Sequence, residues 1–206
     1  MRGYYFITDS GLSRAGNIPD LKAALSAGVT VVQYREKNKS TAEMYSEALE
    51  LRNLCRGSGA LFIINDRIDI SLAVDADGVH LGQGDMPYRV ARSLLGSGKV
   101  IGISVSTVNE AVEAESSGAD YLGVGPVFAT STKTDAAAPC GLELVSVIRK
   151  RCTIPMVAIG GINEYNAAEV VAAGADMVCS ISDVVTHADV AERIRIFSRH
   201  FDMPAL

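Results

Sequence analysis

The stretch SSGADYLGVGPVFATSTK, residues 116–133, contains the structural unit from which the whole chain is built. Gly118 ends a helical pattern, and the short apolar run at 121–124 then predicts a buried strand. A Gly-Pro turn follows and leads to Thr130, Ser131, Thr132 and Lys133. Hydroxyl groups beside an ammonium group suit a phosphorylated ligand, although such a cluster taken alone also fits a solvated loop.

The same order of strand, turn and amphipathic helix recurs about eight times along the 206 residues. The helices that precede SAGVT (26–30) and AAGAD (172–176) end like the one before SSGAD (116–120). The predicted strands are 4–8, 29–34, 61–64, 78–81, 100–104, 121–124, 155–159 and 177–181. The main predicted helices are 19–27, one from Ser40, a short one after Asp66, one from Pro87, one from Thr107, and 142–149, 164–172 and 188–199.

This pattern predicts an α/β protein with a single (βα)8 TIM-barrel domain over residues 1–206. An open doubly wound sheet is the competing architecture, but no GxGxxG motif follows the first strand. Capping boxes are predicted at Ser40 with Glu43 and at Thr107 with Glu110.

The composition narrows the range of partners. A net charge of −5 gives no broad basic field, so we expect neither nucleic acid nor an anionic membrane as a partner. The four cysteines have no CxxC spacing, and they are expected to be reduced and mostly buried. The chain shows neither a signal-peptide pattern nor an apolar run of membrane-spanning length, so a cytoplasmic location is expected.

Polar side chains follow most of the predicted strands, at the end of the barrel where ligands bind. Arg35 and Lys37 follow the second strand and suit a diphosphate, although a surface salt-bridge ladder is the alternative. Asp66 and Asp85 follow the third and fourth strands, and together they would hold Mg²⁺, although each alone also fits a cap or a turn.

The last two strands lead to a second set of anion-binding candidates. Gly160 and Gly161, with Ser182 after the next strand, occupy the usual phosphate-binding position of TIM barrels, and tight strand-helix packing is the alternative explanation. His80 lies within an apolar strand, which favours a structural or supporting role over that of a base. Two phosphorylated ligands at one mouth indicate group transfer rather than a simple isomerisation.

Seven motifs in order carry a resemblance to a known family: QYREK (33–37), IIND (63–66), DGVHLGQGD (77–85), IGISVS (101–106), DYLGVGPVFATSTK (120–133), AIGGI (158–162) and GADMVCSIS (174–182). The chain resembles the thiamine-phosphate synthases, also called thiamine-phosphate pyrophosphorylases. That resemblance implies a Mg²⁺-dependent transferase. Such an enzyme joins 4-amino-5-hydroxymethyl-2-methylpyrimidine diphosphate to 4-methyl-5-(2-hydroxyethyl)thiazole phosphate and releases diphosphate.

The resemblance also implies a role for individual residues. The pyrimidine diphosphate set is Gln33, Tyr34, Arg35, Glu36, Lys37, Asn65, Ser104 and Lys133. The thiazole phosphate set is Thr130, Ser131, Thr132, Gly161, Ile181 and Ser182, and the metal ligands are Asp66 and Asp85. Within the first set, Arg35, Lys37 and Lys133 would act in catalysis by neutralising the leaving diphosphate.

The implied chemistry needs no general base, because the thiazole nitrogen is a nucleophile without a proton to remove. The small residues at 134–139 are expected to close over the site as a lid. The alternatives are a tautomerase-like isomerase that binds only the thiazole phosphate, a non-catalytic ligand sensor, and a phosphosugar isomerase. The sequence leaves open whether the protein forms a homo-oligomer.

Overall fold

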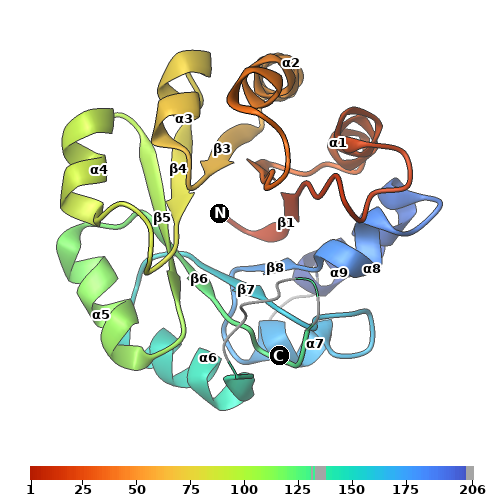
Figure 1. The fold of residues 1–206 in the computed structure, drawn as a ribbon. Coiled ribbons are helices and arrows are strands. Elements are labelled where there is room, and N and C mark those ends of the chain that lie inside the picture. Colours follow the sequence, from red (N-terminus) through yellow and green to blue (C-terminus); the bar gives the residue numbers. More distant parts are fainter. Residues whose placement is uncertain (131, 133–137, 203–206) are drawn as a thin grey trace.

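The computed structural model describes residues 1–130, 132 and 138–202, and this part of the chain forms a closed barrel of eight parallel strands (Figure 1). Each strand pairs with the next in sequence, and the first pairs with the last. The strands are β1 (Gly3–Ile7), β2 (Val31–Tyr34), β3 (Leu61–Asn65), β4 (Gly78–Leu81), β5 (Val100–Val105), β6 (Tyr121–Val124), β7 (Met156–Ile159) and β8 (Met177–Cys179). The predicted (βα)8 fold is confirmed.

Helices connect the strands and surround the barrel, as Figure 1 shows. They are α1 (Asn17–Ser26), α2 (Thr41–Ser58), α3 (Ile68–Val74), α4 (Tyr88–Leu95), α5 (Val108–Ser117), α6 (Gly141–Arg151), α7 (Ala167–Ala172), α8 (Ile181–Val185) and α9 (Val190–Asp202). Both predicted capping boxes form, at the first turns of α2 and α5. Gly28, Gly118 and Gly174 all have positive φ angles, so the predicted glycine helix ends are confirmed.

Several boundaries differ from the prediction by one to three residues, including one after β7 and one at the end of β8. The eighth strand ends at Cys179, and Ile181 begins the short helix α8 instead of completing the strand. The seventh helix begins at Ala167, because Asn163 and Asn166 form a tight turn before it. In that turn the Asn166 side chain accepts a hydrogen bond from the Asn163 backbone, and the Asn163 side chain accepts one from the Tyr165 backbone.

Alternation along each strand separates two cores. Tyr4 and Phe6 of β1 belong to the large core between barrel and helices, whereas Tyr5 and Ile7 belong to a smaller core inside the barrel. Successive side chains of a strand point to opposite faces, so this division follows directly from β geometry. The interior core consists of Tyr5, Ile7, Val31, Ile63, Tyr121, Val157, Met177 and Cys179.

Glycine at position 102 makes room for one of these interior side chains. A Cβ atom at Gly102 of β5 would lie 2.0 Å from Cζ of Tyr121, which is fully buried. Because interior side chains are close-packed, the ring could not move aside without cost. The small residue on β5 therefore allows a large one on β6.

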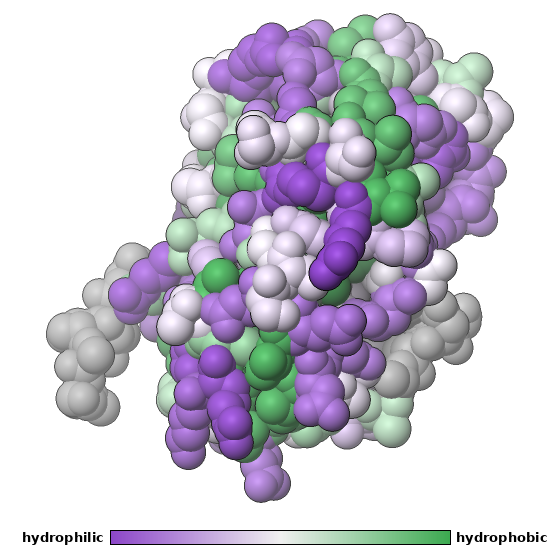
Figure 2. Space-filling view, turned by 90° about the vertical axis from the view of Figure 1, so that its left-hand side faces the viewer, coloured by the Kyte–Doolittle hydropathy of each residue, from purple (hydrophilic) through white to green (hydrophobic). Residues whose placement is uncertain are grey.

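The outer face of α4 and α5 carries exposed apolar side chains among polar ones, namely Val90, Leu94 and Val112. Figure 2 shows this face, where hydrophobic and hydrophilic residues are interspersed. In the described ranges no helix has the length and apolar character needed to cross a membrane.

We predict that Gly102→Ala lowers the free energy of unfolding by about 1–3 kcal/mol, because the new methyl group overpacks the barrel interior. Urea denaturation would measure the change. Gly98→Ala is the matched control, since a Cβ atom there meets nothing within 4 Å. Equal stability of the two variants would contradict this account of the interior.

Candidate functional site

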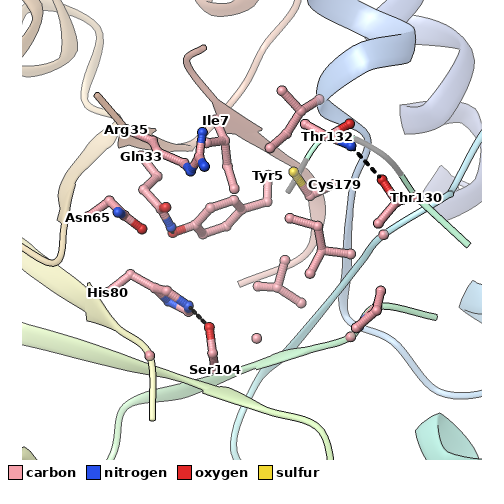
Figure 3. A pocket seen from close by; sticks show the side chains of 18 of the residues that line it. Tyr5, Ile7, Gln33, Arg35, Asn65, His80, Ser104, Thr130, Thr132 and Cys179 are labelled. Atoms are coloured by element: carbon pink, nitrogen blue, oxygen red, sulfur yellow. Dashed lines mark hydrogen bonds between the residues drawn. The ribbon is translucent and has the colours of Figure 1, made fainter. Parts of the chain in front are cut away.

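A cavity of about 490 Å³ opens at the carboxyl ends of the strands (Figure 3). All eight strands or the loops that follow them contribute to its lining. Twelve of the residues expected at the site line it: Gln33, Arg35, Lys37, Asn65, Asp66, Asp85, Ser104, Thr130, Thr132, Gly161, Ile181 and Ser182. Residues from both expected ligand sets are thus brought together in one cavity.

Two cations lie at one side of the cavity, and each is paired with a carboxylate. The Arg35 guanidinium donates to Asp9 over 2.9 Å, and the Lys37 ammonium donates to Asp66 over 2.6 Å. The Lys37 side chain is half exposed, so its ion pair is of the weak, solvent-screened kind. Lys37 therefore remains available to an anion that enters the cavity, whereas Arg35 is held by Asp9 in a mostly buried ion pair.

Asp66 and Asp85 lie at the same side, where their carboxyl groups interact with each other. Burial alone would raise the pKa of Asp66, but the hydrogen bonds with Lys37 and Asp85 and the charges of Lys37 and His80 together outweigh burial and hold that pKa below its ordinary value. Burial and the neighbouring Asp66 carboxylate together raise the pKa of Asp85. The pair is thus a concentration of negative charge in a partly desolvated place.

This donor set fits a magnesium ion. Mg²⁺ commonly uses one or two carboxylates, and it completes its shell with water and substrate phosphates. Within the described residues, no group of three or more His, Cys, Asp or Glu side chains is arranged to hold a metal. A site built on Asp66 and Asp85 would therefore need oxygen atoms from a phosphorylated ligand or water.

The other side of the cavity is lined by small and hydroxyl-bearing residues. Ile181 and Ser182 form the first turn of α8, and Gly161 follows β7. Gly161 has a φ angle of 64°, and a Cβ atom there would lie 2.5 Å from the carbonyl oxygen of Ala129. Glycine thus lets the chain after β7 pack on the loop after β6, where Thr130 and Thr132 are hydrogen-bonded to each other (Figure 3).

A chain of hydrogen bonds joins five residues at the floor of the cavity. Gln33 Nε2 donates to the Tyr5 hydroxyl over 2.9 Å, and that hydroxyl lies 2.7 Å from the Tyr121 hydroxyl. The Tyr121 hydroxyl lies 2.9 Å from His80 Nδ1, and His80 Nε2 lies 2.9 Å from Ser104 Oγ. Figure 3 shows the last of these contacts. We call this chain the interior relay.

The sequence prediction missed Tyr5 and Tyr121 as part of the site. Tyr5 was predicted only as part of the strand 4–8 and Tyr121 only as part of the apolar run 121–124, although they share the inward face with the predicted Gln33 and Ser104. The signal was the alternation itself, because Tyr5 and Ile7 face inward when Tyr4 and Phe6 face outward. The prediction for His80 as a structural or supporting residue agrees with its nearly buried place in the relay.

Tyr34 and Glu36 do not line the cavity, so the structure does not bring them together with the rest of the expected pyrimidine diphosphate set, and their assignment to it stays a prediction. Tyr34 points away from the barrel axis, as the residue after an inward Gln33 must, and its hydroxyl donates to Glu47 of α2. Glu36 turns back on its own loop, where its carboxylate accepts hydrogen bonds from the backbone of Lys37 and Asn38. Ser131 and Lys133 lie outside the described residues, as does most of the expected lid at 134–139.

The Glu36 carboxylate shapes the loop that carries Lys37. It also accepts a hydrogen bond of 2.5 Å from Ser10, and its side chain is almost fully buried. Burial by itself would raise the pKa of Glu36, but the hydrogen bonds from Ser10, Asn38 and Lys37 outweigh burial and lower it. Glu36 thus holds the backbone of the loop from which the Lys37 side chain extends.

We predict that Glu36→Gln lowers the free energy of unfolding at pH 7 by about 1–3 kcal/mol, the usual contribution of hydrogen bonds to a charged group. A lowered folded-state pKa contributes stability above the unfolded-state pKa and loses it as the pH falls through the folded-state value. The stability difference between the two proteins should therefore narrow below the ordinary Glu value of 4.5. Urea denaturation at a series of pH values would measure it. A difference that stays constant into acid would contradict the lowered pKa.

Comparison with known proteins agrees with this geometry. A family model described as thiamine monophosphate synthase matches residues 4–184. The thiamine-phosphate synthase of Chloroflexus aurantiacus is 55% identical over 192 residues, which cover 93% of this chain and 88% of that protein. The thiamine-phosphate synthase of Methanosarcina mazei is 50% identical over 194 residues, which cover 94% and 80%.

A solved structure of a thiamine phosphate pyrophosphorylase from Pyrococcus furiosus is similar over the whole barrel. It superposes with a TM-score of 0.90 at 44% identity, and the match covers 97% of this chain and 95% of that one. The family model, the sequence relatives and this structure all agree with the resemblance carried by the seven motifs. The chain belongs to the thiamine monophosphate synthase family.

Proposed function

We propose that the protein is a thiamine-phosphate synthase that joins 4-amino-5-hydroxymethyl-2-methylpyrimidine diphosphate to 4-methyl-5-(2-hydroxyethyl)thiazole phosphate. The products are thiamine phosphate and diphosphate. The observation that carries the proposal is the two-sided cavity. Arg35, Lys37, Asp66 and Asp85 gather on one side, and hydroxyl and glycine residues gather on the other. Two anionic ligands fit this arrangement, and membership of the family supplies their identity.

The cationic side would hold the diphosphate. Arg35 and Lys37 would exchange their carboxylate partners for oxygen atoms of the diphosphate, which they bind through charge-assisted hydrogen bonds. Ser104 and Asn65 line the same cavity and would add neutral contacts. Lys133, assigned through the family resemblance alone, would supply a third cation.

The opposite side would hold the thiazole phosphate. Loops after the seventh and eighth strands of a TIM barrel, with the beginning of a short extra helix, commonly bind a phosphate group. Gly161, Ile181 and Ser182 occupy those positions, and α8 is such a short helix. The hydroxyl groups of Thr130 and Thr132, and that of Ser131 by the resemblance, would donate further hydrogen bonds.

Mg²⁺ bound by Asp66 and Asp85 would neutralise charge on the diphosphate as it leaves. The residues of the chain would hold both substrates in line and stabilise the departing diphosphate through Arg35 and Lys37. Positive charge that develops on the pyrimidine methylene is stabilised by the aminopyrimidine ring itself. No side chain has to remove a proton, because the attacking thiazole nitrogen carries none.

We also propose that the reaction takes place in the cytoplasm, because all four cysteines are unpaired thiols and Cys55, Cys152 and Cys179 are buried. Self-association, which the sequence leaves open, would be decided by light scattering on the purified protein.

The function is tested by incubating the purified protein with both substrates and measuring diphosphate and thiamine phosphate. We expect release of diphosphate only when both substrates and Mg²⁺ are present. Omission of either substrate, or removal of metal by chelation, should abolish it. Absence of product from the complete mixture would overturn the proposal. Turnover that persists without divalent metal would overturn the part of the proposal that concerns the metal.

We predict that Asp85→Asn lowers turnover on the order of 10²-fold, the size of loss typical when one stabilising group is removed from a transition state. Binding of the thiazole phosphate, measured by calorimetry, should remain. Asp69→Asn is the matched control, since Asp69 is an exposed carboxylate on α3 that is paired with Arg67. Full turnover by Asp85→Asn would remove Asp85 from the metal site.

A further inference from the structure

The interior relay has one direction of donation, because the hydrogen atoms available to each residue determine which partner donates and which accepts. An amide nitrogen donates and cannot accept, so the bond from Gln33 Nε2 uses an oxygen lone pair of Tyr5. The single hydrogen of the Tyr5 hydroxyl is then free for its other neighbour, the Tyr121 hydroxyl. Burial raises the pKa of both tyrosines, so both hydroxyl groups keep their hydrogen atoms at neutral pH.

The direction continues through the imidazole ring. Because Tyr121 accepts from Tyr5, its own hydrogen goes to His80 Nδ1, which must carry a lone pair. The neutral ring then bears its hydrogen on Nε2 and donates it to Ser104 Oγ. Ser104 accepts this bond, and its hydroxyl hydrogen is left to point into the cavity.

The opposite direction satisfies fewer groups. If Tyr121 donated to Tyr5, the Tyr5 oxygen would accept two bonds and its own hydrogen would need another acceptor. In the described part of the chain, the Tyr5 hydroxyl is hydrogen-bonded to Gln33 and Tyr121 alone. Tyr5 is only 1% exposed, so an unpaired hydrogen there would be buried without a partner, which is unfavourable.

We propose that Tyr5, Tyr121 and His80 are positioning residues that hold the Ser104 hydroxyl as a hydrogen-bond donor to the anionic substrate. That the anion is a diphosphate rests on the proposed function. A hydroxyl whose oxygen already accepts a bond from His80 has its hydrogen directed at the ligand before the ligand arrives. Such preorganisation avoids the cost of reorienting a dipole during the reaction.

Two glycines reserve the space that the relay occupies. A Cβ atom at Gly102 would overlap the Tyr121 ring, and one at Gly123 would lie 2.8 Å from Cε1 of His80. Neither glycine has a positive φ angle, so backbone conformation does not require glycine at either position. Gly102 of β5 thus leaves room for the Tyr121 ring, and Gly123 of β6 leaves room for the His80 ring.

The first test is the tautomer of His80, measured by ¹⁵N nuclear magnetic resonance of the imidazole nitrogens in the protein without ligands. The chain has three histidines, so the signals can be assigned by substitution. We expect hydrogen on Nε2 and none on Nδ1 in the wild-type protein. We also expect a measurable Nδ1–H population in Tyr121→Phe. Hydrogen on Nδ1 in the wild-type protein would overturn the proposal.

Tyr4→Phe is the matched control for this measurement. It also removes a buried tyrosine hydroxyl from β1, but that hydroxyl donates to the carbonyl oxygen of Ser180 outside the relay. The His80 signals should therefore not change in Tyr4→Phe. If Tyr121→Phe does not fold, the wild-type tautomer still decides whether the direction is correct.

The second test is binding of inorganic diphosphate with Mg²⁺, measured by calorimetry in a double-mutant cycle. Ser104→Ala should weaken binding about tenfold, and Tyr121→Phe should weaken it severalfold, the scale of a hydrogen bond to a charged group. In the Ser104→Ala background, Tyr121→Phe should have no further effect, because its influence passes through Ser104. Equal weakening in both backgrounds, or none in either, would overturn the positioning role. Neither test needs turnover. If the protein proved to have no synthase activity, the proposed function would be refuted, but the two tests would still show whether the relay has the proposed direction and effect.

Discussion

The alternation of side chains along a closed barrel is the constraint on which this structure depends. Eight parallel strands end at one mouth, so every loop that follows a strand reaches the same cavity. Alternation then decides which strand residues face that cavity. Gln33 and Ser104 face inward, whereas Tyr34, one residue away from Gln33, packs outward against α2. The cavity is therefore assembled from one or two residues of each of the eight strands, together with residues of the loops that follow them.

The local parts of this arrangement were readable from the sequence. A capping box needs only Ser40 and Glu43, and a helix end needs only a glycine such as Gly118, so both were predicted correctly. Contacts between strands that are far apart in the sequence could not be predicted from local motifs in this way. The bond between Tyr5 and Tyr121 joins residues 116 positions apart, and it exists only because the barrel closes with this register. QYREK predicts Tyr34 and Glu36 at the site as part of one contiguous motif, but the structure places both outside the cavity lining, because neighbouring residues of a strand point to opposite faces.

The polar residues inside the barrel are tolerated because they satisfy one another. Four of the five relay residues are large, and burying their polar atoms unpaired would destabilise the fold. Joined end to end, they leave the Gln33 amide at one end and the Ser104 hydroxyl at the other. A network of this kind specifies a single arrangement of its members, since any broken link leaves a buried group unpaired. The same requirement that keeps the interior stable also fixes what it presents to the cavity.

The ion pairs of the cavity differ from the interior relay, because a ligand could exchange with one of their partners. Arg35 with Asp9 and Lys37 with Asp66 keep two cations near their working places while no anion is present. The half-exposed Lys37 forms a solvent-screened pair, a kind worth about 0–1 kcal/mol, so a diphosphate would replace Asp66 there at little cost, whereas the Arg35–Asp9 pair is mostly buried. Release of Asp66 from Lys37 would at the same moment free an oxygen for a divalent cation. If the proposed sites are correct, binding of the anion and binding of the metal would thereby be linked through one salt bridge, and each would strengthen the other.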